Sequence, residues 1–197
     1  MKRQFLLVTC LWLFALALSV AAYAGEPLDL VKSTVDKALE ILQEPRLQAK
    51  EKRTEKLNLL RDTVNPVFDY GEMARRTLGK HWAGRSKAEQ EEFIKLFRNF
   101  VERVYTDKVE LYNGERVVFG RETIDRDLAQ VESFVVDAKG EKSSVVYRLL
   151  KNQSGWKLYD AVVEDISIIA NYRSQFDRII RNSSYQELIR RLSEKTN

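Results

Sequence analysis

A change in hydrophobic periodicity near residue 164 organises the C-terminal half of the chain. Apolar and polar side chains nearly alternate over residues 156–163, and this period of two predicts a strand. From Ser167 the period lengthens to about 3.6 residues, which predicts an amphipathic helix with Ser167 as its N-cap. The apolar stripe of that helix consists of Ile168, Ile169, Tyr172, Phe176, Ile179 and Ile180.

Four antiparallel strands are expected in this half of the chain. Alternating apolar positions place them at 116–122, 129–137, 142–151 and 156–163. Turns that contain glycine separate the second strand from the third and the third from the fourth. Because both connections are short, the strands that they join should run antiparallel.

The register of the sheet follows from these two turns. If Lys151 pairs with Trp156 and Asp137 pairs with Lys142, most large apolar side chains fall on one face, which can then cover a helical layer. A slip of one residue would turn them to the other face. The expected inner face consists of Phe134, Val136, Val145, Tyr147, Leu149, Leu158 and Val162. The expected cross-strand pairs are Leu149 with Leu158, Tyr147 with Asp160, and Val145 with Val162.

Helices are expected before the strands. Apolar residues at helical spacing predict a first helix that starts near Pro27 and that Pro45 ends. A second helix follows and is closed by Pro66. Its first part, residues 46–56, is highly charged and forms either a solvated face or a surface for a partner.

Three capping boxes, at Asp69, Ser86 and Ser184, predict further helix starts. The helix after Ser86 is the longest, and its broad apolar face is either ordinary core or one wall of a cavity. That face consists of Phe93, Leu96, Phe97, Phe100, Val101, Val104, Tyr105 and Val109. Helices, then a meander of strands, then helices indicate an α+β fold.

Residues 1–24 have the pattern of a cleaved secretory signal peptide. Lys2 and Arg3 precede an apolar stretch, and Ala22 and Ala24 form a small-x-small cleavage site. The apolar stretch is short for a membrane span, so an uncleaved anchor is the less favoured alternative. Cleavage would leave residues 25–197 as a single domain, large enough for a substantial core.

Charge and cysteine content narrow the function classes. Loss of Lys2 and Arg3 with the leader lowers the formal net charge from +4 to +2, so the chain lacks the strong basic excess typical of nucleic-acid binding. The one cysteine, Cys10, lies in the leader, which leaves no thiol or disulfide in the mature chain. Stability must therefore come from packing.

The sequence offers little for catalysis. His81 is the single histidine, which rules out a site with two histidine ligands, and G-x-S-x-G and phosphate-loop motifs are absent. We expect His81 to have a structural role near a helix C-terminus. The enzyme alternative rests on carboxylates near the inner face of the sheet, namely Glu132, Asp160, Glu164 and Asp165. The simpler interpretation is that Asp160 accepts a hydrogen bond from Tyr147 or pairs with Arg173.

Several ordered segments resemble one known family. They are Asn171-Tyr172-Arg173-Ser174-Gln175-Phe176, Phe68-Asp69-Tyr70, Met73, Leu78-Gly79-Lys80-His81-Trp82 and Trp156-Lys157-Leu158-Tyr159-Asp160. In these segments the chain resembles the MlaC family of toluene-tolerance, periplasmic phospholipid-binding proteins. The likeness extends over nearly the whole chain after residue 24, although no segment is a catalytic fingerprint.

The resemblance implies a fold, a ligand and partners. The fold would be a strongly curved four-stranded sheet wrapped on helices, similar to an NTF2-like roll, that encloses an apolar cavity. The function would be carriage of glycerophospholipid through the periplasm, between an outer-membrane lipoprotein complex and an inner-membrane lipid ABC transporter, to maintain outer-membrane lipid asymmetry. The ligand would be phospholipid, without a cofactor or metal, in a monomeric, non-enzymatic protein that binds no nucleic acid.

The expected lipid contacts come from the inner face of the sheet and the two flanking helices. The cavity candidates are Phe100, Val104, Tyr105, Val109, Phe134, Val136, Val145, Tyr147, Leu149, Leu158, Val162, Ile166, Ile169 and Tyr172. Arg173 is the candidate contact for the lipid headgroup. Two alternatives remain at this stage: an exported interaction module with a solid core, and an NTF2-like enzyme that uses a cavity carboxylate.

Overall fold

The computed structural model of the protein describes residues 26–109 and 111–196, apart from the side chains of residues 105, 107–109 and 196. The expected leader, residues 1–24, lies outside these described residues. Within the described part of the chain, no helix combines the length and apolar character that a membrane span requires.

The described residues form helices, then a sheet, then helices, as the sequence predicts. The helices are α1 (Glu26–Gln43), α2 (Arg53–Val64), α3 (Tyr70–Leu78), α4 (Lys87–Val109), α5 (Ile168–Asn182) and α6 (Tyr185–Thr196). The strands are β1 (Arg116–Asp125), β2 (Leu128–Val136), β3 (Lys142–Asn152), β4 (Gly155–Val163) and β5 (Ile166–Ser167). Short 3₁₀ turns lie at Pro45–Leu47, Lys50–Lys52, Asn65–Val67 and Gly79–His81.

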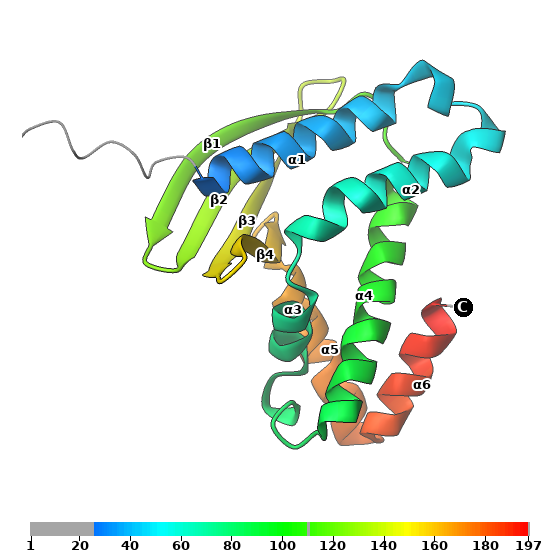
Figure 1. Ribbon diagram of the computed structural model, residues 1–197, viewed down its shortest axis with the longest axis vertical. Helices are drawn as coiled ribbons and strands as arrows, with labels where there is room; N and C mark the ends of the chain where they lie inside the picture. Colours follow the sequence, from blue (N-terminus) through cyan, green and yellow to red (C-terminus); the bar gives the residue numbers. More distant parts are fainter. Residues whose placement is uncertain (1–25, 110, 197) are drawn as a thin grey trace, which may run out of the picture.

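The elements form two packed groups that meet at an angle (Figure 1). Helix α1 lies across the curved sheet, and α2 turns back beside α1 toward the rest of the molecule. Helices α3, α4, α5 and α6 form a second group beyond one end of the sheet. The α+β class and the helical cover on one face of the sheet are therefore confirmed.

The sheet has five antiparallel strands in the order β1-β2-β3-β4-β5, so the expected count of four is wrong by one. The additional strand has two residues and pairs with the end of β4 through a tight turn. The turn residues Glu164 and Asp165 have φ of 47° and 63°, the left-handed region that type I′ hairpins need. Asn-Gly is the usual signal for such a turn, which explains why Glu-Asp did not indicate a hairpin.

The predicted register of the β2–β3 hairpin is wrong by one residue. Val136, rather than Asp137, pairs with Lys142. Asp137 belongs to the turn instead, where its carboxylate accepts hydrogen bonds from the amides of Lys139 and Glu141. Phe134 and Val136 consequently lie on the face opposite to Tyr147. Val136 is buried there, whereas Phe134 is 38% exposed.

The predicted register of β3 and β4 is confirmed near their shared turn and is wrong farther from it. Leu149 pairs with Leu158 as predicted, but an irregularity follows, and Tyr147 pairs with Ala161 rather than Asp160. A β-bulge on β4 puts one more residue on that strand than on its partner, which shifts every later pair. Val145 therefore pairs with Val163, and Val162 falls on the face opposite to Tyr147.

The predicted helix starts are confirmed by cap hydrogen bonds. The amide of Glu72 donates to Asp69, that of Ala170 to Ser167 and that of Glu187 to Ser184. At α4 the box is reciprocal, because the amide of Ser86 also donates to the Glu89 carboxylate at 2.8 Å. These side chains satisfy backbone donors that a helix start leaves without partners.

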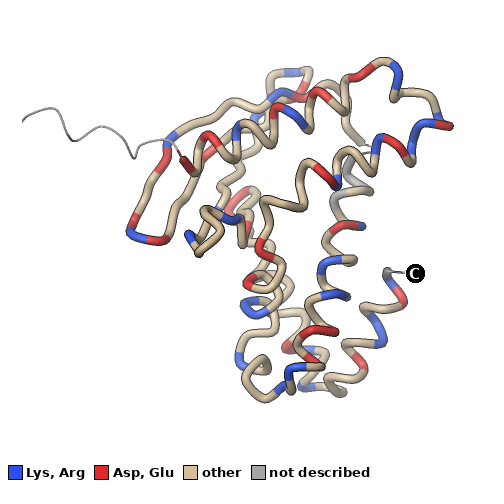
Figure 2. The backbone as a smooth tube through the Cα atoms, viewed as in Figure 1, with Lys and Arg blue, Asp and Glu red and all other residues tan. Residues whose placement is uncertain are grey.

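The second helix begins later than expected, at Arg53, after two 3₁₀ turns. Leu47, only 1% exposed, anchors the first of these turns in the protein interior. Arg46 and Lys52 both bind the Glu55 carboxylate, at 2.7 and 2.9 Å. Figure 2 shows basic and acidic residues interspersed over this end of the molecule, so neither sign of charge dominates it.

Two hydrophobic cores hold the described part of the chain together. The larger joins α3, α4, α5 and α6 and contains Tyr70, Met73, Ala74, Leu78, Phe93, Phe97, Phe100, Ile169, Phe176, Tyr185, Leu188 and Leu192. The smaller lies between α1 and the sheet and contains Val31, Ala129, Val131, Leu149 and Trp156. The candidate functional site lies where these cores approach each other.

Candidate functional site: an apolar cavity between two cores

An apolar cavity of about 160 Å³ lies at the junction of the helical group and the sheet. Side chains from α3, α4, β3, β4 and α5 line it, and nearly all of them are aromatic or aliphatic. They are Phe68, Met73, Phe100, Val101, Val104, Tyr147, Leu158, Asp160, Ala161, Ile168 and Tyr172. A lining of this composition suits hydrocarbon rather than a polar ligand.

A second apolar cavity of about 110 Å³ continues from the first toward α1 and α2. Its lining residues are Val31, Thr34, Val35, Ala38, Val64, Val67, Phe68, Tyr147 and Leu158. Phe68, Tyr147 and Leu158 line both cavities and therefore form the partition between them. Together the cavities extend from the α1–α2 layer to α4 and α5.

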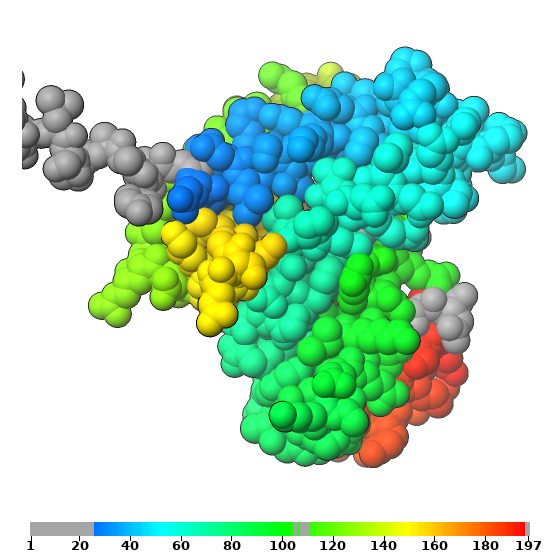
Figure 3. All heavy atoms as spheres, viewed as in Figure 1, coloured from blue at the N-terminus to red at the C-terminus, as the bar shows by residue number. Residues whose placement is uncertain are grey.

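Helices α1 and α2 close this path from the outside. In the space-filling view, the atoms of α1 adjoin those of the β3–β4 hairpin and of the segment that leads from α2 to α3 (Figure 3). A bulky apolar ligand that used both cavities would lie beneath α1 and α2.

Tyr147 carries the one hydroxyl in the partition between the cavities. Burial raises the pKa of this hydroxyl, and a hydrogen bond with Ser133 partly opposes that effect. Ser133 in turn donates to the carbonyl of Val145 at 3.2 Å. The hydroxyl group is therefore satisfied within the sheet, and the ring is left to face the cavities.

Phe100 and Tyr172 form the wall of the larger cavity on the helical side. Their rings meet edge to face, with centroids 4.9 Å apart and an interplanar angle of 88°. Burial raises the pKa of the Tyr172 hydroxyl. This pair closes the cavity toward α6, because an edge-to-face contact at this distance leaves no space between the rings.

Asp160 holds the sheet to the start of α5 and is only 2% exposed. Its carboxylate accepts hydrogen bonds from the Ser167 hydroxyl at 2.6 Å and the Ile169 amide at 3.1 Å, and it pairs with Arg148 at 3.2 Å. These partners replace Tyr147 and Arg173, the partners expected from the sequence. With both oxygens engaged, the carboxylate is suited to a structural role rather than proton transfer.

The structure brings together five of the cavity candidates, namely Phe100, Val104, Tyr147, Leu158 and Tyr172. Leu149 is fully buried in the core under α1, Val145 is buried on the same face of the sheet, and Ile169 is buried in the helical core. Ile166 lies on β5 and is 61% exposed. Phe134, Val136 and Val162 are on the opposite face, and the side chains of Tyr105 and Val109 lie outside the described residues.

Several cavity residues were not predicted from the sequence. Val31, Val35 and Ala38 belong to the apolar stripe of α1, and that stripe gave no sign that part of it faces a cavity. Phe68 was expected in a family segment and in a small cluster at the turn after the third helix, rather than at a cavity. Ala161 takes the position opposite Tyr147 because of the β4 bulge, which no sequence signal marked.

Arg173 and His81 both brace the turn after α3. The Nε of Arg173 donates to the Arg76 carbonyl at 2.6 Å, and its side chain lies against Gly79, whose φ is +57°. His81 Nε2 lies 2.8 Å from Asp177 Oδ1 of α5, so its partner is a carboxylate rather than a helix carbonyl. Headgroup contact by Arg173 stays a prediction. Across the residues whose side chains are described, no group of three or more His, Cys, Asp or Glu is arranged to hold a metal ion.

A curved antiparallel sheet, a helical cover and an apolar cavity between them define a class of binding protein that encloses an apolar ligand. Comparison with known families identifies the family of this chain. The family described as MlaC protein matches residues 32–194, and the chain belongs to the MlaC family. The resemblance found in the sequence is thereby confirmed.

A solved structure has the same fold. It is a phospholipid-binding protein from Ralstonia solanacearum in complex with a phospholipid, with a TM-score of 0.73 and 24% sequence identity. The match covers 85% of this chain and 95% of that one. At this identity the likeness establishes the fold.

Proposed function

We propose that this protein binds phospholipid and holds its acyl chains in the two linked apolar cavities, with the headgroup left toward solvent. The observation that carries the proposal is that two apolar cavities adjoin at Phe68, Tyr147 and Leu158, which line both. Membership of the MlaC family and a phospholipid in the Ralstonia protein of the same fold support it.

A phospholipid meets a large free-energy barrier to transfer through water without a carrier. Two acyl chains hold about 30 methylenes, and exposure of each costs about 0.8 kcal/mol, so an unassisted lipid would meet a barrier on the order of 20 kcal/mol in water. A protein that covers both chains removes most of this barrier. Since it only has to compete with a bilayer, it needs no specific contact with the headgroup.

The cavities must widen to take a lipid. Their volumes of about 160 and 110 Å³ fall below the ~300–1,000 Å³ of typical small-molecule pockets. The chains would enter by displacing the side chains between the cavities and the α1–α2 layer above them.

We further propose a location and partners. The leader pattern in residues 1–24 directs the protein to the periplasm, where it would move phospholipid between an outer-membrane lipoprotein complex and an inner-membrane ABC transporter, as a non-enzymatic monomer. The family membership supports these assignments. Energy for net transport would come from the transporter.

A vesicle assay tests the carrier function. Donor vesicles with a fluorescent, self-quenched phospholipid are mixed with unlabelled acceptor vesicles, with and without the purified mature protein. A carrier increases the transfer rate in proportion to its concentration. A rate that does not depend on the protein would instead favour the interaction module with a solid core.

A further inference from the structure

A further pocket, of about 310 Å³, lies between α4, α5 and α6, on the other side of the Phe100–Tyr172 pair from the central cavity of about 160 Å³. Its volume reaches the lower end of the range typical of small-molecule sites. Four apolar side chains form its interior: Phe176, Ile179, Leu188 and Leu192. The proposed carrier function does not use this pocket.

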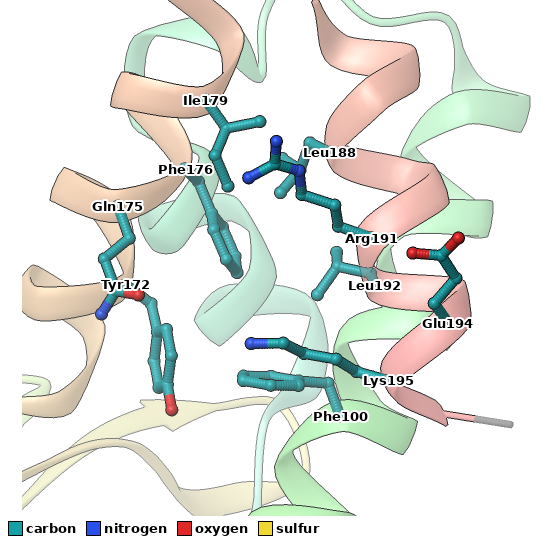
Figure 4. A pocket seen from close by; sticks show the side chains of 10 residues that line it. All are labelled: Phe100, Tyr172, Gln175, Phe176, Ile179, Leu188, Arg191, Leu192, Glu194 and Lys195. Carbon is teal, nitrogen blue, oxygen red and sulfur yellow. The ribbon is translucent and has the colours of Figure 1, made fainter.

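Two cations from α6 reach into this pocket. In Figure 4 the ammonium of Lys195 and the guanidinium of Arg191 extend from α6 toward α5, above the aromatic rings. Lys195 Nζ lies 5.7 Å from the centre of the Phe100 ring. An apolar interior with cations at its mouth is complementary to a molecule with an alkyl body and an anionic end.

The acidic side chains near the pocket leave this positive charge only partly balanced. Glu194 also lines the pocket, but its carboxylate pairs with Arg190, which does not line it. Glu187 pairs with the Nε of Arg191 at 2.7 Å, which fixes the base of that guanidinium and leaves its end directed into the pocket. Lys195 is therefore the main candidate anion ligand, and Arg191 is the second.

Two aromatic side chains stand between this pocket and the central cavity. Phe100 and Tyr172 line both, and their edge-to-face contact at 4.9 Å is the wall between them. On the α4 side, Nη1 of Arg103 donates to the Lys195 carbonyl at 2.8 Å, which holds the end of α6 over the pocket. A ligand in the α6 pocket would therefore leave the central cavity free for phospholipid.

We propose that the α4–α5–α6 pocket binds a single-chain amphiphile with a phosphate headgroup. The phosphate lies at Lys195 and Arg191, and the alkyl chain lies against Phe176, Leu188 and Leu192. Such a molecule is what remains when a diacyl phospholipid loses one chain. The site would let the protein hold this product together with an intact phospholipid.

Dodecyl phosphate is a suitable probe, and dodecyl maltoside and inorganic phosphate are its controls. Each is titrated into the protein as isolated, with occupancy counted by native mass spectrometry and affinity measured by calorimetry. We expect one dodecyl phosphate per protein, bound without loss of phospholipid. Inorganic phosphate should bind more weakly, because it lacks the alkyl contacts.

The variants Lys195→Gln and Arg191→Gln test whether these two side chains bind the phosphate of the probe. A charge-assisted hydrogen bond to phosphate is strong enough that Lys195→Gln should weaken dodecyl phosphate binding by about tenfold or more. Arg181→Gln, which removes an exposed cation of α5 that does not line the pocket, should leave it unchanged. Dodecyl maltoside should not distinguish the variants.

Three results would overturn the proposal: release of phospholipid as dodecyl phosphate binds, equal affinity for dodecyl maltoside, or equal affinity in Lys195→Gln and wild type. The first would show that the probe enters the central cavity. If the isolated protein carries no phospholipid, the proposed carrier function is in question, but the dependence on Lys195 still tests the α6 pocket.

Discussion

Phe68 and Leu158 lie side by side in a single parallel β-bridge, with the Asp69 amide donating to the Leu158 carbonyl at 2.9 Å. This one link connects the start of α3 to the middle of β4. Because both side chains also line both apolar cavities, the junction of helices and sheet is also the centre of the proposed lipid site. Widening of the cavities would have to occur around this fixed point.

Replacement of Asp160 by alanine should destabilise the fold. It leaves Arg148 and the amide of Ile169 without their buried acceptor, and loss of one partner of a buried ion pair costs about 3–5 kcal/mol. We expect about 3 kcal/mol, because Arg148 is 37% exposed and water can replace part of the interaction. Urea unfolding measures the change. Asp62→Ala, at an exposed position of α2, is the control, and an equal effect of both variants would contradict the structural role of Asp160.

Replacement of His81 by glutamine should weaken the fold slightly and leave lipid carriage intact. The hydrogen bond to Asp177 is partly exposed, so its loss should cost about 1 kcal/mol. Lipid transfer should stay within tenfold of wild type, whereas loss of a catalytic acid or base removes about 10²–10⁴-fold. Lys80→Gln, which removes the other side chain that contacts Asp177 Oδ1, is the matched control. A folded, lipid-loaded His81→Gln protein without transfer activity would argue against the non-enzymatic function.

Acid should remove the stabilisation that Glu187 gives to the start of α6. Hydrogen bonds from Arg190 and Arg191 lower the pKa of Glu187 from 4.5 to about 2. Because the folded-state pKa is depressed, the stabilisation is present above pH 4.5 and is lost as the pH falls toward about 2. The difference in Tm between wild type and Glu187→Gln should therefore shrink over this interval. Glu91→Gln, at an exposed position of α4, is the control. A difference that stays constant with pH would contradict the assignment.

The signal-peptide pattern of residues 1–24 predicts where the mature protein begins. Processing after Ala24 should give a chain that begins at Gly25, and the mass of protein purified from the periplasm reports this directly. Ala24→Leu should block processing, because the cleavage site requires a small residue. Mature protein that keeps its leader and stays with the membrane would support the anchor alternative.

Much of the fold could be predicted because its signals are local. Asp69, Ser86, Ser167 and Ser184 mark helix starts through side-chain contacts with residues three positions away, and a pattern of that length is visible in the sequence. The four longer strands follow in the same way from alternation of apolar and polar positions.

The parts of the site that were missed depend on contacts between distant segments. The bulge on β4 moves Ala161 opposite Tyr147, and no residue type near it requires a bulge. The Asp137 turn shifts β2 by one residue and so removes Phe134 and Val136 from the inner face. Apolar residues serve equally for filled core and for cavity wall, so the pattern could not separate Leu149 in the core from Leu158 at the cavity.

Native mass spectrometry of the mature protein tests the central claim most directly. Ala161 lines the larger cavity opposite Tyr147, and Ala161→Trp should fill that cavity with little cost to folding. Val118→Trp places the same side chain on the other face of the sheet, at a position that is 42% exposed. The account predicts phospholipid mass increments on wild type and Val118→Trp, and bare, folded protein for Ala161→Trp. Folded wild-type protein without lipid, or equal loading of all three proteins, would contradict the claim that this cavity holds the acyl chains.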